Sequence, residues 1–163
     1  MGRERHQDGG ERLEDFLGHI LVVCPRCGHR AEVIPRGDAI PEAALNPPLF
    51  SPRRLICQSC GFTRDWQGHT VRLHGGSGPP RDAYFQCPLY LVDACGGQVL
   101  WAYNLDHLSL IERHVRAKLR GDPAGWGHGG LVNRLPRWMI LAKNRRRVLA
   151  AIVRLREKDG LKS

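Results

Sequence analysis

Four cysteines in two matched pairs are the residues best suited to chemistry in this sequence of 163 residues. The segments Cys24-Pro-Arg-Cys27-Gly28 and Cys57-Gln-Ser-Cys60-Gly61 both read C-x-x-C-G, and 29 residues separate them. Tetrahedral zinc takes four thiolates at about 2.3 Å, and each C-x-x-C turn presents two of them to one ion. The following glycine permits the positive φ of a tight turn. The pattern predicts one structural Zn²⁺, with no open position for catalysis, bound by Cys24, Cys27, Cys57 and Cys60.

Other uses of the cysteines are weaker interpretations. Two disulfides would require an oxidising compartment, and the polar N-terminal residues do not resemble a secretory signal. A thioredoxin-like redox motif accounts for one C-x-x-C but not for a matched second. We expect Cys87 and Cys95 to be buried thiols on strands. A second metal site that uses them with His107 or His114 is an alternative, and so is a disulfide.

Apolar segments flank both cysteine pairs. Residues 16–23 and 30–34 surround the first pair, and residues 53–56 and 62–66 surround the second. A strand, a cysteine turn and a strand, repeated once, predict a zinc ribbon in which the metal substitutes for a large core. Residues 70–74 read as a further strand. Residues 84–91 and 98–103 predict a hairpin closed around Cys95-Gly96-Gly97.

Two helices are expected after the hairpin. Leu108, Ile111, Val115 and Leu119 share one face of a helix over 106–120, for which Asn104 or Asp106 offers an N-cap. A second helix is expected from Pro136 to about Glu157. The predicted fold is α+β, with an N-terminal four-Cys zinc ribbon of short antiparallel strands, a β-hairpin extension and two C-terminal α-helices. The predicted division is a flexible tail (1–15), the ribbon (16–74), and the hairpin with a two-helix basic region (83–163).

Positive charge is concentrated in the last third of the chain. The formal net charge is +9, and residues 104–163 carry 14 basic and 5 acidic side chains. Such asymmetry indicates an anionic partner, with nucleic acid ahead of an acidic protein or a membrane surface. The alternative is an ordinary solvated helix face. The candidate phosphate-binding residues on the last helix are Lys143, Arg146, Arg147, Arg154 and Lys158.

The paired cysteine turns resemble transcription-factor-IIB-type zinc ribbons, and the whole chain resembles a family of bacterial proteins named for that ribbon. The wider resemblance lies in both C-x-x-C-G turns, Cys95-Gly96, residues 100–104 (LWAYN) with His107-Leu108, residues 135–139 (LPRWM) and residues 142–145 (AKNR). The family has no assigned activity. The resemblance therefore implies zinc and a nucleic-acid context, and it implies no reaction.

These patterns together predict a non-enzymatic, cytoplasmic zinc-binding protein. We expect it to associate with nucleic acid, DNA or RNA, through its basic C-terminal helix. The alternative is a zinc-ribbon adaptor that docks a protein partner by the ribbon edge or residues 43–52. No Ser/His/Asp grouping, H-E-x-x-H motif or phosphate-binding loop is present, so neither an enzyme nor a small-molecule substrate is expected. The longest apolar run, Ile20-Leu21-Val22-Val23, is too short to span a bilayer.

Overall fold

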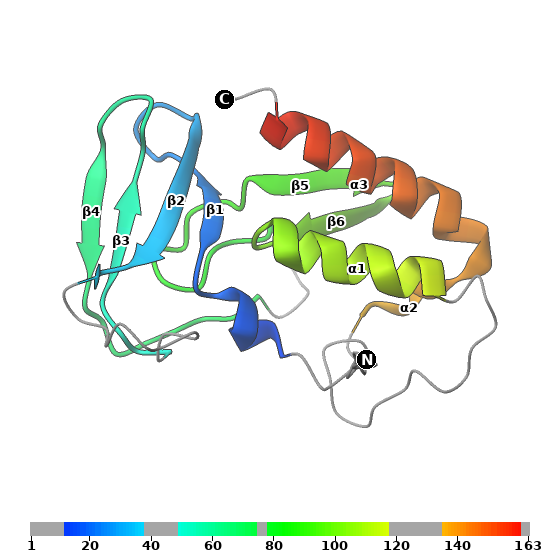
Figure 1. Ribbon diagram of the computed structural model, residues 1–163, viewed down its shortest axis with the longest axis horizontal. Helices are drawn as coiled ribbons and strands as arrows, with labels where there is room; N and C mark the ends of the chain where they lie inside the picture. The colour runs from blue at the N-terminus through cyan, green and yellow to red at the C-terminus, as the bar shows by residue number, and fades with distance from the viewer. Residues whose placement is uncertain (1–11, 38–48, 75–77, 118–134, 161–163) are drawn as a thin grey trace, which may run out of the picture.

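The computed structural model describes residues 12–37, 49–74, 78–117 and 135–160, and its fold is α+β. A four-stranded sheet forms one side of the molecule, and a hairpin covered by helices forms the other (Figure 1). In chain order the elements are η1 (Leu13–Phe16), β1 (Ile20–Val23), β2 (Arg30–Pro35), β3 (Arg53–Ile56), β4 (Thr63–Trp66), β5 (Leu91–Cys95), β6 (Gln98–Ala102), α1 (Leu105–Ala117), α2 (Arg137–Ile140), η6 (Ala142–Asn144) and α3 (Arg145–Gly160).

The four-stranded sheet is an antiparallel meander in the order β1-β2-β3-β4. The pair Val23 and Arg30 closes the β1–β2 hairpin, and the pair Ile56 and Thr63 closes the β3–β4 hairpin. Because β3 runs antiparallel to β2, with Ile56 opposite Glu32, both hairpin tips lie at the same end of the sheet. This register brings the two cysteine turns together.

The C-terminal half is built on the β5–β6 hairpin. Its two-residue turn, Gly96-Gly97, has φ values of 56° and 82°, which match the right-handed twist of the flanking strands. Helices α1 and α3 lie side by side along the hairpin (Figure 1). Asn104 caps α1, because its Oδ1 accepts the His107 N–H at 2.9 Å. The apolar faces of α1 and α3 form one core with Leu91 and Leu100.

Strand β1 lies between two hydrophobic cores and contributes side chains to both. Ile20 and Val22 pack in the core of the ribbon, whereas Leu21 packs in the core of the helices and the hairpin. The Leu21 N–H donates to the Tyr103 carbonyl at 2.8 Å, and the Leu21 carbonyl accepts the Tyr90 N–H at 3.0 Å. Since successive side chains of a strand point to opposite faces, a strand buried on both faces has the continuous apolar sequence seen here.

Three expectations about the elements need correction. Residues 70–74 form no strand, and the hairpin begins only at Leu91. The expected last helix is broken at Leu141, whose ψ of 133° is extended, so α3 begins at Arg145. The Asn144 Nδ2 donates to the Trp138 carbonyl at 2.8 Å and stabilises this break. Within the expected tail, residues 1–11 lie outside the described residues, and Leu13–Phe16 form η1.

Candidate metal centre

The two cysteine turns have the same backbone geometry. The Cys24 N–H donates to the His29 carbonyl at 2.7 Å, and the Cys57 N–H donates to the Phe62 carbonyl at 2.8 Å. The Gly28 and Gly61 N–H groups donate back to the carbonyls of the first cysteines, at 3.0 and 2.9 Å. These glycines have φ values of 76° and 74°, the region that glycine occupies without strain. The repeated C-x-x-C-G sequence therefore folds into the same turn twice.

The four sulfurs converge on one point. The Sγ atoms of Cys24 and Cys60 lie 3.8 Å apart, and those of Cys27 and Cys57 lie 3.6 Å apart. All four lie within 4.8 Å of one another. Four metal–sulfur bonds of about 2.3 Å in a tetrahedron give sulfur–sulfur distances of about 3.8 Å, whereas a disulfide requires about 2.05 Å. The donor set and its spacing therefore fit one tetrahedral metal ion.

Electrostatics also favour a cation at this point. Burial works to raise the pKa of the Cys24 thiol, but hydrogen bonds from the Cys27 and Arg26 N–H groups and from neighbouring thiols lower that pKa to about 7. For Cys27, the His29 N–H has a lowering effect, yet burial and the three other cysteines together raise the pKa to about 12. A cluster of four thiols cannot ionise fully by itself, and a bound divalent cation removes that repulsion.

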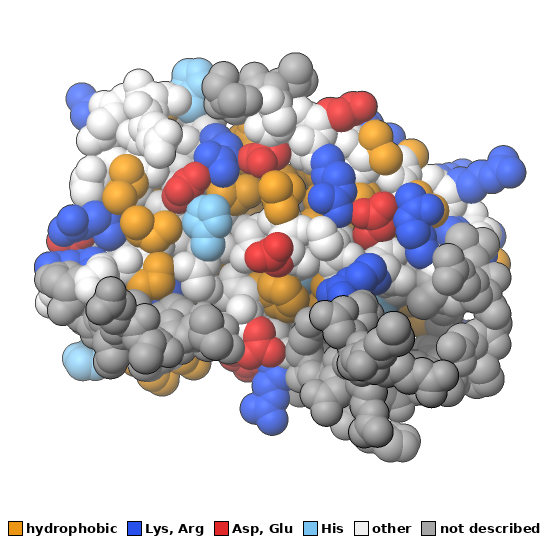
Figure 2. Space-filling model, viewed as in Figure 1, with side chains coloured by type: hydrophobic (Ala, Val, Ile, Leu, Met, Phe, Trp, Pro, Cys, Tyr) orange, Lys and Arg blue, Asp and Glu red, His pale blue; other side chains and the backbone are white. Residues whose placement is uncertain are grey.

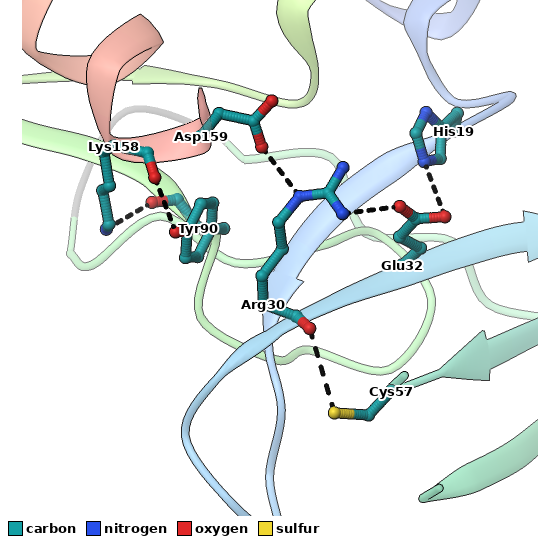
Figure 3. Close-up of polar contacts among 7 residues, drawn as sticks. All are labelled: His19, Arg30, Glu32, Cys57, Tyr90, Lys158 and Asp159. Atoms are coloured by element: carbon teal, nitrogen blue, oxygen red, sulfur yellow. Dashed lines mark hydrogen bonds and ion pairs between the residues drawn. The ribbon is translucent and has the colours of Figure 1, made fainter. Parts of the chain in front are cut away.

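Three arginines close to the cysteines in sequence have other partners for their side chains. Arg53 is fully buried, donates to the Leu17 carbonyl at 2.9 Å and lies 4.6 Å from the centre of the Tyr84 ring. Arg54 pairs with Asp65 at 2.6 Å. Arg30 pairs through its side chain with Glu32 and Asp159, while its carbonyl lies 3.8 Å from the Cys57 Sγ (Figure 3).

A third turn resembles the cysteine turns but uses a carboxylate. The Asp82 N–H donates to the Cys87 carbonyl at 2.9 Å. In each cysteine turn, likewise, the N–H of the first cysteine donates to the carbonyl five residues later. Gln86 stands where Gly28 and Gly61 stand in those turns, and its φ is 58°. The buried Asp82 carboxylate accepts the N–H groups of Tyr84, Phe85 and Cys87 at 2.6–2.9 Å. This turn is not predicted from the sequence, where its one signal is an aspartate at the start of a turn.

The remaining cysteines lie outside the metal site. Cys95 ends β5 as expected, whereas Cys87 is in a turn and not on a strand. Both are buried free thiols, and burial is the main cause that raises the pKa of Cys87 to about 11. Among the described residues, only the four ribbon cysteines form a group that could hold a metal ion, and neither His107 nor His114 joins such a group.

The candidate phosphate-binding residues have different surroundings. Lys143 lies on η6 and not, as expected, on the last helix. Its side chain is exposed, and so are those of Arg146 and Arg147 in the first turn of α3. The Arg154 Nε pairs with Asp93 at 2.7 Å. The Lys158 Nζ donates to the Tyr90 carbonyl at 2.8 Å and lies 4.3 Å from the centre of that ring. On the face in Figure 2, blue and red side chains alternate over α1 and α3.

Comparisons of the chain with family models, curated proteins and solved structures give no match. No described helix has the length and apolar character needed to cross a membrane.

Proposed function

We propose that the protein is a non-enzymatic zinc protein that binds nucleic acid through the basic side chains around the start of α3. The convergence of four Sγ atoms within 4.8 Å carries the first part of the proposal. Zinc is favoured because four thiolates in a tetrahedron suit it without any redox requirement. The ion would hold the two hairpin tips of the ribbon together. With all four positions taken by cysteine, it would have no open position for catalysis.

The test of the metal centre is to measure which metal is bound and how many ions each chain binds. Native mass spectrometry and elemental analysis of protein purified without added metal are expected to give one zinc per chain. A coloured protein that contains iron would show that iron and not zinc occupies the four-thiolate site. The proposed metal centre would then stand with a different ion. A metal-free protein that is folded in reducing buffer would contradict the proposed centre.

The charge distribution around α3 supports the nucleic-acid part. The first turn of α3 contains Arg145, Arg146 and Arg147 and no acidic residue. Positive side chains are unfavourable at a helix N-terminus, where the helix dipole is already positive. An external anion would relieve this repulsion. Phosphates of a nucleic acid supply such anions, and arginine binds them through two donors at once.

The binding test uses labelled duplex DNA and single-stranded RNA in fluorescence polarisation at several salt concentrations. We expect binding whose log affinity falls with log salt by about 0.9 for each duplex phosphate contact. The double charge reversal Arg146→Glu/Arg147→Glu is expected to abolish it. The matched control, Arg64→Glu/Arg72→Glu, makes the same change in net charge at exposed ribbon residues and is expected to retain most of the binding. Equal losses in both variants would contradict a localised surface.

The second candidate function is a protein-interaction adaptor, and one observation favours it. Phe50 is 58% exposed in the segment that follows β2, and residues 43–48 of the expected docking loop lie outside the described residues. Phe50→Asp would weaken capture of a protein partner and leave nucleic-acid binding unchanged. The charge reversal at Arg146 and Arg147 would have the opposite pattern of effects.

A further inference from the structure

An open depression of about 280 Å³ lies between the β5–β6 turn and the N-terminal half of α3. Ala150 lies three and four residues after Arg147 and Arg146, and four before Arg154, so all four side chains share one face of the helix. The small side chain of Ala150 leaves the space between the arginines open. The lining residues are Ala94, Cys95, Gly96, Arg146, Arg147, Ala150 and Arg154.

The Arg147 side chain lies against the hairpin turn at Gly96. A Cβ atom built on Gly96 would lie 2.8 Å from the Arg147 Nη1 and 3.3 Å from its Cδ, so the lack of a side chain at Gly96 gives Arg147 the space that it occupies. Arg147 also lines an adjoining cavity of about 20 Å³ with Trp138 and Asn144. The Arg147 side chain therefore lies at the side of the depression next to the β5–β6 turn.

The depression has an excess of positive charge. Asp93 pairs with Arg154 at 2.7 Å, which offsets one charge. Among the described residues, Arg146 and Arg147 form no ion pair. Three guanidinium groups around one carboxylate leave a net charge that favours an anion. Apolar surface from Ala94 and Ala150 lies between them, so the ligand should carry an apolar part next to its charge.

We propose that this depression binds one phosphodiester group of a nucleic-acid backbone, a step that rests on the proposed function. Arg146, Arg147 and Arg154 donate to the phosphate oxygens, and the adjoining sugar packs on Ala94 and Ala150. Guanidinium groups suit this role because two parallel N–H donors match two phosphate oxygens. Lys143 does not line the depression, and the Lys158 ammonium is bonded to the Tyr90 carbonyl. The main contact is thus a compact site that uses three of the five candidate phosphate-binding residues.

The decisive variant is Ala150→Leu, which fills the depression without changing any charge. Leucine is a good helix former and position 150 is exposed, so the fold should persist. We expect about tenfold weaker binding to labelled nucleic acid, the loss of roughly one charge-assisted contact. Val153→Leu, on the same helix but outside the depression, is the matched control and should bind like the wild type. Its residue is 50% exposed.

A second pair of variants separates the site from general electrostatics. Arg147→Ala and Lys143→Ala each remove one positive charge near the start of α3. Arg147→Ala is expected to weaken binding about tenfold and to reduce the salt slope by about 1. Lys143→Ala should have a much smaller effect. Inorganic phosphate at constant ionic strength should compete weakly, because it lacks the sugar contacts and the neighbouring phosphates.

The outcomes distinguish this inference from the proposed function. If the wild type binds no nucleic acid at low salt, both are wrong. If the wild type binds and Ala150→Leu and Arg147→Ala bind equally well, the basic surface acts but the depression is not its phosphate site. Displacement of the oligonucleotide by dilute inorganic phosphate would overturn the assignment to a backbone phosphate, because it would show a site for a small free anion.

Discussion

Arg30 and Asp159 form an ion pair, with 2.7 Å between the Arg30 Nε and the Asp159 Oδ1, that joins the ribbon to the end of α3. Arg30 directly follows the first cysteine turn, and its carbonyl lies 3.8 Å from the Sγ of Cys57 (Figure 3). One residue therefore contacts a side chain of the four-cysteine cluster through its backbone and the C-terminal helix through its guanidinium. Arg30 therefore links the four-cysteine cluster to the end of α3.

Asp159→Asn is expected to destabilise the protein by about 1 kcal/mol, as befits a half-buried ion pair. The Arg30 and Asp159 side chains are 28% and 15% exposed, so the pair is partly shielded from solvent. A double-mutant cycle with Arg30→Gln, measured by urea denaturation of the metal-loaded protein, gives the coupling energy. The same cycle on Arg154 and Asp93, where Arg154 is 53% exposed, should give about 0.5 kcal/mol or less. Equal couplings would show that burial of the first pair has no energetic effect.

Removal of the metal is expected to unfold the ribbon. The four-stranded sheet has short strands, and the metal contributes folding free energy where the core is small. A chelator in reducing buffer should lower the thermal midpoint, and zinc should restore it. Cys57→Ser should lose the bound ion, whereas Cys87→Ser, which alters another buried thiol, should keep one ion per chain. Loss of the ion in both variants would place Cys87 in the site.

The ribbon could be predicted because its signals in the sequence are local. Each C-x-x-C-G turn is closed by hydrogen bonds within six residues, so its sequence alone determines its shape. The break at Leu141 was missed because the apolar period continues through it, and the bond from Asn144 to the Trp138 carbonyl has no periodic signal. The pairing of Arg30 with Asp159 is equally invisible, because it depends on how β1 brings the two cores together.

Gly28→Ala and Gly61→Ala are each expected to cost about 1 kcal/mol of stability. No atom lies within 4 Å of a Cβ built at either position, so the cost is backbone strain at φ values of 76° and 74° and not a clash. Gly37→Ala is the control, because its Cβ also meets nothing and its φ is not positive. Urea denaturation of the three zinc-loaded variants should show no loss for Gly37→Ala. A similar loss at all three positions would refute the strain argument.

Asp82→Asn is expected to destabilise the protein by about 2 kcal/mol or more. Both carboxylate oxygens accept N–H groups, at 2.9 Å from Tyr84, 2.7 Å from Phe85 and 2.6 Å from Cys87. An amide has one acceptor oxygen, so its NH₂ group would face a buried N–H donor. Thermal unfolding compared with Asp106→Asn, an exposed position on α1, measures the effect. If Asp82→Asn were as stable as this control, the carboxylate would not hold the turn.

His107 is expected to make stability fall between about pH 6.5 and pH 4. Burial lowers the pKa of this histidine to about 4 from its ordinary 6.5, and its Nδ1 accepts the Tyr103 N–H at 3.1 Å. The unfolded chain therefore binds more protons than the folded one in this range. Stability from this group is present above pH 6.5 and is lost as the pH falls, by at most about 1.4 kcal/mol per pH unit.

The measurement is urea denaturation at about pH 7 and about pH 5 of the wild type and of His107→Gln. Glutamine can accept the Tyr103 N–H through its carbonyl oxygen and does not titrate. The wild type should lose more stability than the variant between the two pH values, by roughly 2 kcal/mol. Both proteins contain the same four ribbon cysteines, so any loss of metal at low pH affects them alike and cancels in the difference. Parallel losses in the two proteins would show that His107 is not held neutral by its burial.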